Sequence, residues 1–349
     1  MLYGIAAAGT ALLLAAALTA GLRSLALRTG RRFVDRPGGR KAHARPTPHL
    51  GGVAVATATG AVATAATASG TTPLDSTTGT LLLAAGAVAL LGFLDDLRPM
   101  GARVRVIVEA GAASVVVHGT QLGFTAGALA VLWVVFVTNA FNLLDNSDGA
   151  MGTVGVITAL GLCVCAGAEG LDSLALVLGL LAASLTGFLV HNWYPARIFL
   201  GDCGSLFAGF LVACAALLVN VGHTAPASLA SLFAVTVVAT ADTVLVLVSR
   251  HRAGRGLLCG GTDHIAHRLR HLGLTVPGAA VALGAAAGTG TATGVLLHHG
   301  VVGAPMVGWL GGAAAASVVL LLRVPVYGAR GQVRDPARAR GNSGDLARS

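Results

Sequence analysis

Residues 126–149 read AGALAVLWVVFVTNAFNLLDNSDG, an apolar run that ends in a cluster of amide and carboxylate side chains. With its flanks, the run is long enough for a membrane-spanning helix, which needs about 20 apolar residues. The polar positions recur every three residues, which lines one face of a helix that Gly149 can end; they are Asn139, Asn142, Asp145 and Asp148. A capped helix end with solvated carboxylates is the alternative, but a cap needs only one such side chain. Because unpaired polar groups are costly near lipid, we expect a functional site here.

The rest of the chain has the composition of a polytopic membrane protein. Of its 349 residues, 55% are hydrophobic and 11% are charged, against about 25% charged in an ordinary soluble domain. Its apolar runs of about 17–22 residues match the thickness of a bilayer. We therefore predict an all-α integral membrane protein with about eleven transmembrane helices, near residues 2–22, 51–69, 78–94, 104–118, 126–144, 151–168, 173–191, 204–221, 229–249, 275–298 and 302–322.

The basic residues predict the orientation. All 23 fall in alternate connections: eight in 23–45, three in 98–105, one at 197, five in 250–270 and six in 323–348. By the positive-inside rule these connections are cytoplasmic, so the N-terminus is expected outside and the C-terminus inside the cell membrane. The first apolar run lacks a preceding basic region, which favours a retained span over a signal peptide. We predict one transmembrane domain over 1–322 and a basic, disordered tail over 323–349, with too few aromatics for nucleic-acid binding.

Two of the predicted cytoplasmic loops are strongly basic. The first holds Lys41 and His43 and opens onto the glycine pair 51–52 at the start of a span. It fits either a phosphate-binding loop or a charge run that only sets topology. The loop at 250–272 carries five arginines, and its histidines at 264 and 267 would share one face of a helix. Zinc is an alternative ligand there, but the crowding of arginines favours an anion.

Acidic residues lie at other span ends on the same predicted side. The adjacent carboxylates of Asp95 and Asp96 resist double ionisation unless a metal ion or one of the following arginines balances them; these are Arg98, Arg103 and Arg105. Asp202 lies between glycines where a cation can approach. Carboxylates that hold Mg²⁺, surrounded by cations that hold phosphates, have the composition that phosphoryl transfer requires.

On these residues the chain resembles the polyprenyl-phosphate N-acetylhexosamine-1-phosphate transferases, from about residue 35 to 273. Five motifs follow the family's order and spacing: Asp35…Arg40-Lys41-x-His43…Pro46-x-Pro48-x-x-Gly51-Gly52; Asp95-Asp96; Asn139-x-x-Asn142-x-x-Asp145-x-x-Asp148-Gly149; Pro195-Ala196…Phe199-x-Gly201-Asp202-x-Gly204-Ser205; and the histidine loop. Eleven spans fit the hexosamine branch, whereas the family's phospho-N-acetylmuramoyl-pentapeptide transferases are expected to have ten.

Three departures from the family pattern bear on the substrate. The usual His-x-His-His becomes His264-Ile-Ala266-His267, and the usual Asp-Gly-x-Asp-Gly-Leu-Ala becomes Asp145-Asn-Ser-Asp148-Gly-Ala-Met. The lysine that follows the paired acids in the pentapeptide transferases is Arg98 here. These differences favour the hexosamine branch and leave the sugar open.

The resemblance implies transfer of a sugar 1-phosphate from a UDP-N-acetylhexosamine to a polyprenyl phosphate in the membrane, with release of UMP. It implies a direct Mg²⁺ ligand in Asp202, with Mn²⁺ as a substitute, while Asp95 and Asp96 support the metal or position the acceptor phosphate. His264 and His267 are the implied contacts to the sugar diphosphate. Further substrate contacts are implied for Lys41, His43, Asn139, Asn142, Asp145, Asp148 and Arg268. A second copy of the chain is a further candidate partner.

The same residues leave two other functions open and argue against two more. A pentapeptide transferase and a non-catalytic binder of lipid-linked sugars remain as alternatives. A transporter would place its charges near the bilayer midplane, whereas these lie at span ends. A CDP-alcohol phosphotransferase shares Asp-x-x-Asp-Gly, but here Gly152-Thr153 stands where that family has Ala-Arg.

Overall fold

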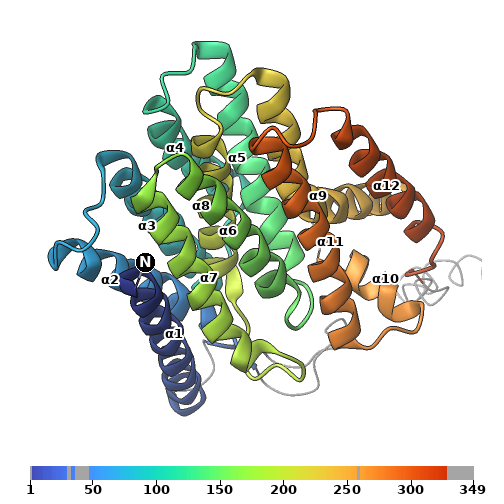
Figure 1. Cartoon of the computed structure of the whole chain (residues 1–349). Coiled ribbons are helices and arrows are strands. Elements are labelled where there is room, and N and C mark those ends of the chain that lie inside the picture. The colour runs from blue at the N-terminus through green and yellow to red at the C-terminus, as the bar shows by residue number, and fades with distance from the viewer. Residues whose placement is uncertain (1, 30–32, 36–46, 258–259, 328–349) are drawn as a thin grey trace, which may run out of the picture.

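The computed structural model describes residues 2–29, 33–35, 47–257 and 260–327 (Figure 1). These residues form twelve helices and one short antiparallel pair of strands. In chain order the elements are α1 (Leu2–Thr29), β1 (Val34–Asp35), β2 (Thr47–Pro48), α2 (Gly51–Ala68), α3 (Ser76–Leu97), α4 (Ala102–His118), α5 (Phe124–Leu144), α6 (Ala150–Ala168), α7 (Asp172–Asn192), α8 (Gly201–Val219), α9 (Ala225–Arg252), α10 (Ile265–His271), α11 (Val276–His298) and α12 (Met306–Leu321).

The structure confirms the prediction of a polytopic all-α membrane protein. Among the described residues, nine helices are long and apolar enough to cross a membrane, and α12 is a shorter apolar helix. The remaining predicted span, at 104–118, corresponds to α4, which has 17 residues and carries Arg103, Arg105 and Glu109. The histidine loop contains the extra helix α10, which has only seven residues. The predicted tail lies outside the described residues from 328 onward.

Helix α8 lies in the middle of the bundle, with α1 and α12 at opposite edges (Figure 1). Of the nine long apolar helices in the described part of the chain it is the most enclosed, since 89% of its most apolar stretch is buried, and it packs against α2, α3 and α5. Small residues permit this close approach in a membrane protein. A Cβ added to Gly52 would lie 2.1 Å from the backbone nitrogen of Gly204, and one added to Gly92 would lie 2.4 Å from the carbonyl oxygen of Asp202. The starts of α2 and α8 and the end of α3 are thereby brought together.

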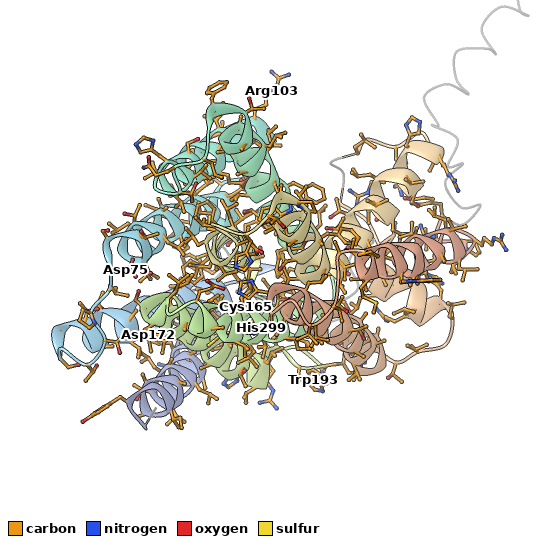
Figure 2. The ribbon with its side chains drawn as sticks, turned by 45° about the horizontal axis from the view of Figure 1, so that its top comes forward. Asp75, Arg103, Cys165, Asp172, Trp193 and His299 are labelled. Carbon is orange, nitrogen blue, oxygen red and sulfur yellow. The ribbon has the colours of Figure 1, made fainter. Side chains whose placement is uncertain are left out.

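The helices alternate in direction, so the bundle has two distinct ends. The end with the start of α8 also holds the ends of α3, α5, α7 and α9, and we call it the acidic end. The other end, at the top of Figure 1, is tilted forward in Figure 2, where Asp75, Asp172 and His299 are labelled. It is held by hydrogen bonds between the first turns of α3 and α7, such as that between the hydroxyls of Thr78 and Ser173 at 3.0 Å.

Candidate functional site

The acidic end is built around Asp202 in the first turn of α8. The amide Nδ2 of Asn142, from α5, donates to Oδ1 of Asp202 at 2.8 Å and to the hydroxyl of Ser205 at 2.9 Å. Nη1 of Arg105, from α4, donates to Oδ2 of Asp202 at 3.0 Å. The Asp202 side chain keeps 31% of its surface exposed, so its fixed carboxylate remains open to a ligand.

Arg105 joins Asp202 to the first acid of the adjacent pair. The same Nη1 lies 2.9 Å from Oδ2 of Asp95, whose Oδ1 accepts a hydrogen bond from the backbone N–H of Met100. Of the three arginines predicted to balance the pair, Arg105 therefore contacts one of its acids, Asp95. Its Nε is buried and has no hydrogen-bond partner among the described residues, which leaves a donor for an anion.

Asp96 plays a different part from its neighbour. Its Oδ1 and Oδ2 accept hydrogen bonds from the backbone N–H groups of Asp202 and Cys203, both at 3.0 Å. A carboxylate at a helix N-terminus satisfies free N–H groups and complements the helix dipole. Asp96 thus fixes the start of α8, and with it the backbone that carries Asp202.

The stripe of four polar residues predicted along one helix is only half helical. Asn139 and Asn142 lie on α5, but that helix ends at Leu144, and a turn carries Asp145 and Asp148. Gly149 does not end α5: with φ of 72° it precedes α6. The asparagine and aspartate side chains favour turns by bonding to nearby backbone, which shortens the helix that the three-residue spacing predicted.

The turn brings its two aspartates to separate partners. Burial, together with the negative charges of Asp202 and Asp96, raises the pKa of Asp145 to about 7. Asp148 lies further along, where its Oδ2 accepts a hydrogen bond from the backbone N–H of Ala196 at 2.9 Å. Asp145 therefore belongs to the acidic cluster, while Asp148 fastens the turn to the connection between α7 and α8.

Two further amides hold this region in place. The side chain of Asn192 accepts from the N–H of Gly149 at 2.9 Å and donates to the carbonyl of Ile198 at 3.0 Å. Sequence reasoning missed Asn192, whose only signal is an amide at the end of a span. Asn139 donates to the buried carboxylate of Glu109 and to the carbonyl of Val135 at 2.9 Å. Asn139 therefore links α5 to α4, the helix that carries Arg105.

The glycine pair at the start of α2 does not receive a phosphate. Its two N–H groups already donate to the carbonyls of Phe199 at 3.0 Å and Leu200 at 2.7 Å. The glycines are instead required by the close packing of α2 on α8. Lys41 and His43, the predicted substrate contacts in the preceding loop, lie outside the described residues.

The histidine loop forms a second cluster at the same end. Asp242, inside α9, is fully buried; its Oδ2 lies 2.8 Å from Nδ1 of His264, and its Oδ1 accepts from the N–H of Ile265 at 2.7 Å. Burial, with His264 and Arg270 nearby, lowers the pKa of His267 to about 4, so this imidazole is neutral at neutral pH. It contacts the backbone of Asn146, which links the loop to the asparagine–aspartate turn.

A pocket of about 620 Å³ opens beside this loop. His267 and Arg270 line it, together with Tyr194, Thr262, His271, Leu274, Thr275 and Val276. Two histidines and an arginine in one pocket supply hydrogen-bond donors and positive charge for an anionic group.

The predicted substrate contact of Arg268 does not fit the structure. Its side chain is 1% exposed, and its nitrogens donate to the carbonyls of Asp263, Leu321 and Val324 and to the hydroxyl of Ser249 at 2.5–3.0 Å. It therefore ties the loop to the end of α12. Arg250 is likewise buried and bonds to Asp263 through Nε at 2.8 Å and Nη2 at 3.1 Å. Arg270 is the arginine of this helix that reaches the pocket.

The acidic cluster suits a hard divalent cation. Its groups offer carboxylate and amide oxygens, the ligands that Mg²⁺ prefers. Asp202 and Asp145 are the candidates to hold one: the side chain of Asp202 is 31% exposed, against 7% for Asp95, and Asp145 lies near enough that, besides burial, the charge of Asp202 raises its pKa. Both oxygens of Asp96 already accept from α8. The cluster has four aspartates and the single positive charge of Arg105, so a divalent cation would balance further negative charge.

Comparison with known proteins agrees with this site. The profile of Glycosyl transferase family 4 matches residues 78–220, which include the acidic cluster. A Streptomyces coelicolor protein, provisionally named a glycosyltransferase, is 49% identical over 86% of this chain and 71% of its own. The decaprenyl-phosphate N-acetylglucosaminephosphotransferase of Mycolicibacterium smegmatis is 30% identical over 66% of this chain and 67% of its own. The phospho-N-acetylmuramoyl-pentapeptide-transferase of Heliobacterium modesticaldum is 35% identical over 51% and 63%. The chain therefore belongs to Glycosyl transferase family 4, a family of polyprenyl-phosphate sugar-1-phosphate transferases.

Proposed function

We propose that this protein transfers an N-acetylhexosamine 1-phosphate, with N-acetylglucosamine 1-phosphate as the first choice, from a UDP-sugar to a polyprenyl phosphate. The observation that carries the proposal is the convergence of Asp95, Asp96, Asp145 and Asp202 with Arg105 at the start of α8. Relatives named for N-acetylglucosamine phosphate transfer support the sugar. The product would be a lipid-linked diphospho-sugar that starts a cell-envelope glycan.

In the proposed reaction, an oxygen of the lipid phosphate attacks the β-phosphorus of the UDP-sugar. A new P–O bond forms, the bond between that phosphorus and the bridging oxygen breaks, and UMP leaves with the bond's electron pair. A phosphate monoester has a second pKa of about 6, so the acceptor is largely dianionic at neutral pH. It needs orientation and charge neutralisation more than a strong base.

The acidic cluster would organise the reacting phosphates. Asp202 and Asp145 would hold Mg²⁺, or Mn²⁺ in its place, which neutralises charge on the phosphoryl oxygens when bound. Asn142 orients Asp202, and Asp96 fixes the helix start that carries it. Arg105 would bind a phosphate oxygen through its free Nε, while Asp95 holds the guanidinium in place.

The histidine loop would bind the sugar diphosphate. Asp242 holds His264 by one ring nitrogen, which leaves the other for a substrate oxygen. His267 and Arg270 reach the pocket beside it, so a neutral donor and a permanent cation are both available. Lys41 and His43 remain proposed contacts from the first loop, and the basic residues predict that this end faces the cytoplasm.

The test is mass spectrometry of the lipid product formed by purified full-length protein from polyprenyl phosphate and a panel of UDP-sugars. We expect a lipid diphospho-N-acetylhexosamine and an equal amount of UMP, both abolished by EDTA and restored by Mg²⁺ or Mn²⁺. A product formed only from UDP-N-acetylmuramoyl-pentapeptide would favour the second candidate, to which the relative from Heliobacterium modesticaldum points. Binding of the lipid-linked sugar without UMP release would identify a non-catalytic binder.

A further inference from the structure

At the end of the bundle opposite Asp202, three metal-binding side chains meet. Glu169 follows α6, His223 lies in the turn between α8 and α9, and His298 is the last residue of α11. Their ligand atoms all lie within 4.8 Å of one another, the one such group of three among the described residues. Nε2 of His223 lies 3.2 Å from Oε1 of Glu169, and Nε2 of His298 lies 3.0 Å from the same oxygen.

His298 supplies an independent sign of a missing partner. Its side chain is 1% exposed, yet neither ring nitrogen makes a hydrogen bond of acceptable geometry to any described residue. A buried imidazole whose hydrogen bonds are missing or poorly aligned is costly, because its polar atoms have lost water. Its Nε2 nevertheless points toward Glu169 and shares that carboxylate with His223, whose ring centroid is 4.6 Å away.

We propose that Glu169, His223 and His298 form a zinc site. Two imidazoles and one carboxylate are a common ligand set for Zn²⁺, with a water in the fourth position. Ligand atoms bound at about 2.1 Å to a tetrahedral ion lie roughly 3.4 Å apart. The two separations from the Glu169 oxygen, 3.0 and 3.2 Å, are close to this value, and all three ligand atoms lie within 4.8 Å of one another, so side-chain movements would bring them to an ion. Mg²⁺ fits less well, because it prefers an all-oxygen shell.

The position of the site suits an ion that links neighbouring segments of the bundle. The three ligands come from three separate segments, and α11 packs on both α6 and α9. Helix α11 is rich in alanine, glycine and threonine along most of its length, and Leu297 in its last turn packs against Ala230 and Ala234. A bound ion would fasten the end of α11 to the connection after α6 and the turn before α9. By the positive-inside prediction, this end faces the outside of the cell.

The test is the metal content of full-length protein purified in detergent without a histidine tag. After loading with Zn²⁺ and dialysis against a weak chelator, we expect about one zinc per chain by elemental mass spectrometry. His223→Ala and His298→Ala should each weaken binding by at least about 10-fold. His118→Ala is the matched control, because His118 is an exposed histidine at the same end of the bundle and lies outside the group. It should retain zinc, as should Asp202→Asn.

If the alanine variants do not fold, a conservative variant and a spectroscopic measurement on the wild type still test the site. Glu169→Gln keeps the side-chain shape and removes the charge, so it should purify while losing zinc. Co²⁺ added to the wild type should give the visible absorption bands of a four- or five-coordinate site, and Zn²⁺ should bleach them. Zinc content near zero in the wild type, or equal zinc in Glu169→Gln and the wild type, would overturn the site and identify a plain Glu–His contact. Neither result bears on sugar-phosphate transfer, because Asp202 lies at the other end.

Discussion

The acidic cluster and the histidine loop lie at the same end of the bundle but use their charges differently. In the acidic cluster, Asp202 is fixed by side chains from other helices and remains open to a ligand. In the histidine loop, Arg250 and Arg268 are buried and bonded to protein, whereas Arg270 and two histidines line the pocket. The number of charges in a loop therefore says little about how many a ligand can reach.

The largest effect is expected from Asp202→Asn. The amide keeps the shape of the side chain but removes the charge that would hold a divalent cation. Turnover should fall by about 10³-fold or more, the scale of a lost electrostatic stabiliser. UMP release by the purified variant measures this, with a thermal melt to check that the protein stays folded.

The matched variant is Asp96→Asn, which separates chemistry from structure within the cluster. Since Asp96 accepts from two N–H groups at the start of α8, its loss should cost about 1–2 kcal/mol of stability, as for a helix cap. A lower melting temperature is therefore the primary expected change. Equal melting temperatures in Asp96→Asn and the wild type would contradict this structural role.

The next effect concerns the histidines. His264→Ala and His267→Ala should each lower kcat by about 10²-fold if they stabilise charge as UMP leaves. Asp242→Asn should match His264→Ala, and the double variant should be no worse, because Asp242 acts through that imidazole. His251→Ala, an exposed histidine at the end of α9, is the control. Near-normal kcat in both histidine variants would remove the loop from the reaction.

The sequence predicted much of this arrangement because lipid imposes simple rules. Apolar run length and the alternation of basic loops were enough to predict the nine long apolar helices of the described residues, the shorter α4 and α12, and the convergence of acids at one end. They could not reveal that α5 stops before Asp145, because turn formation there depends on local side-chain bonds to the backbone. The sequence could not reveal the burial of Arg268 either, because its side chain bonds to the backbone carbonyls of Leu321 and Val324, which are distant in the sequence.

Arg268 and Arg270 test the distinction between an arginine bonded to the protein and an arginine that reaches the pocket. Arg268→Gln should lower stability by about 3 kcal/mol, because several buried carbonyls lose a charged donor. Arg270→Gln should leave the melting temperature unchanged and raise the KM for the UDP-sugar by about 10-fold, the scale of one lost charge-assisted hydrogen bond. Thermal melts and initial rates on the same preparations give both values. The reverse pattern would mean that Arg268 is the substrate contact.

The smallest effect is a pH dependence of stability that originates in the histidine loop. Burial, with His264 and Arg270 nearby, lowers the pKa of His267 to about 4 in the folded protein, against about 6.5 in an unfolded chain. Between these values the unfolded state binds more protons, so stability falls as the pH is lowered from 6.5 toward 4. His267→Gln cannot take up this proton, so the part of the fall in stability with pH that His267 causes should be absent from this variant. Melting temperatures of both proteins between pH 7 and pH 4 should therefore converge or cross as the pH falls. A constant difference across the range would show that His267 is solvated in the folded protein, and the neutral imidazole proposed for the pocket would have to be abandoned.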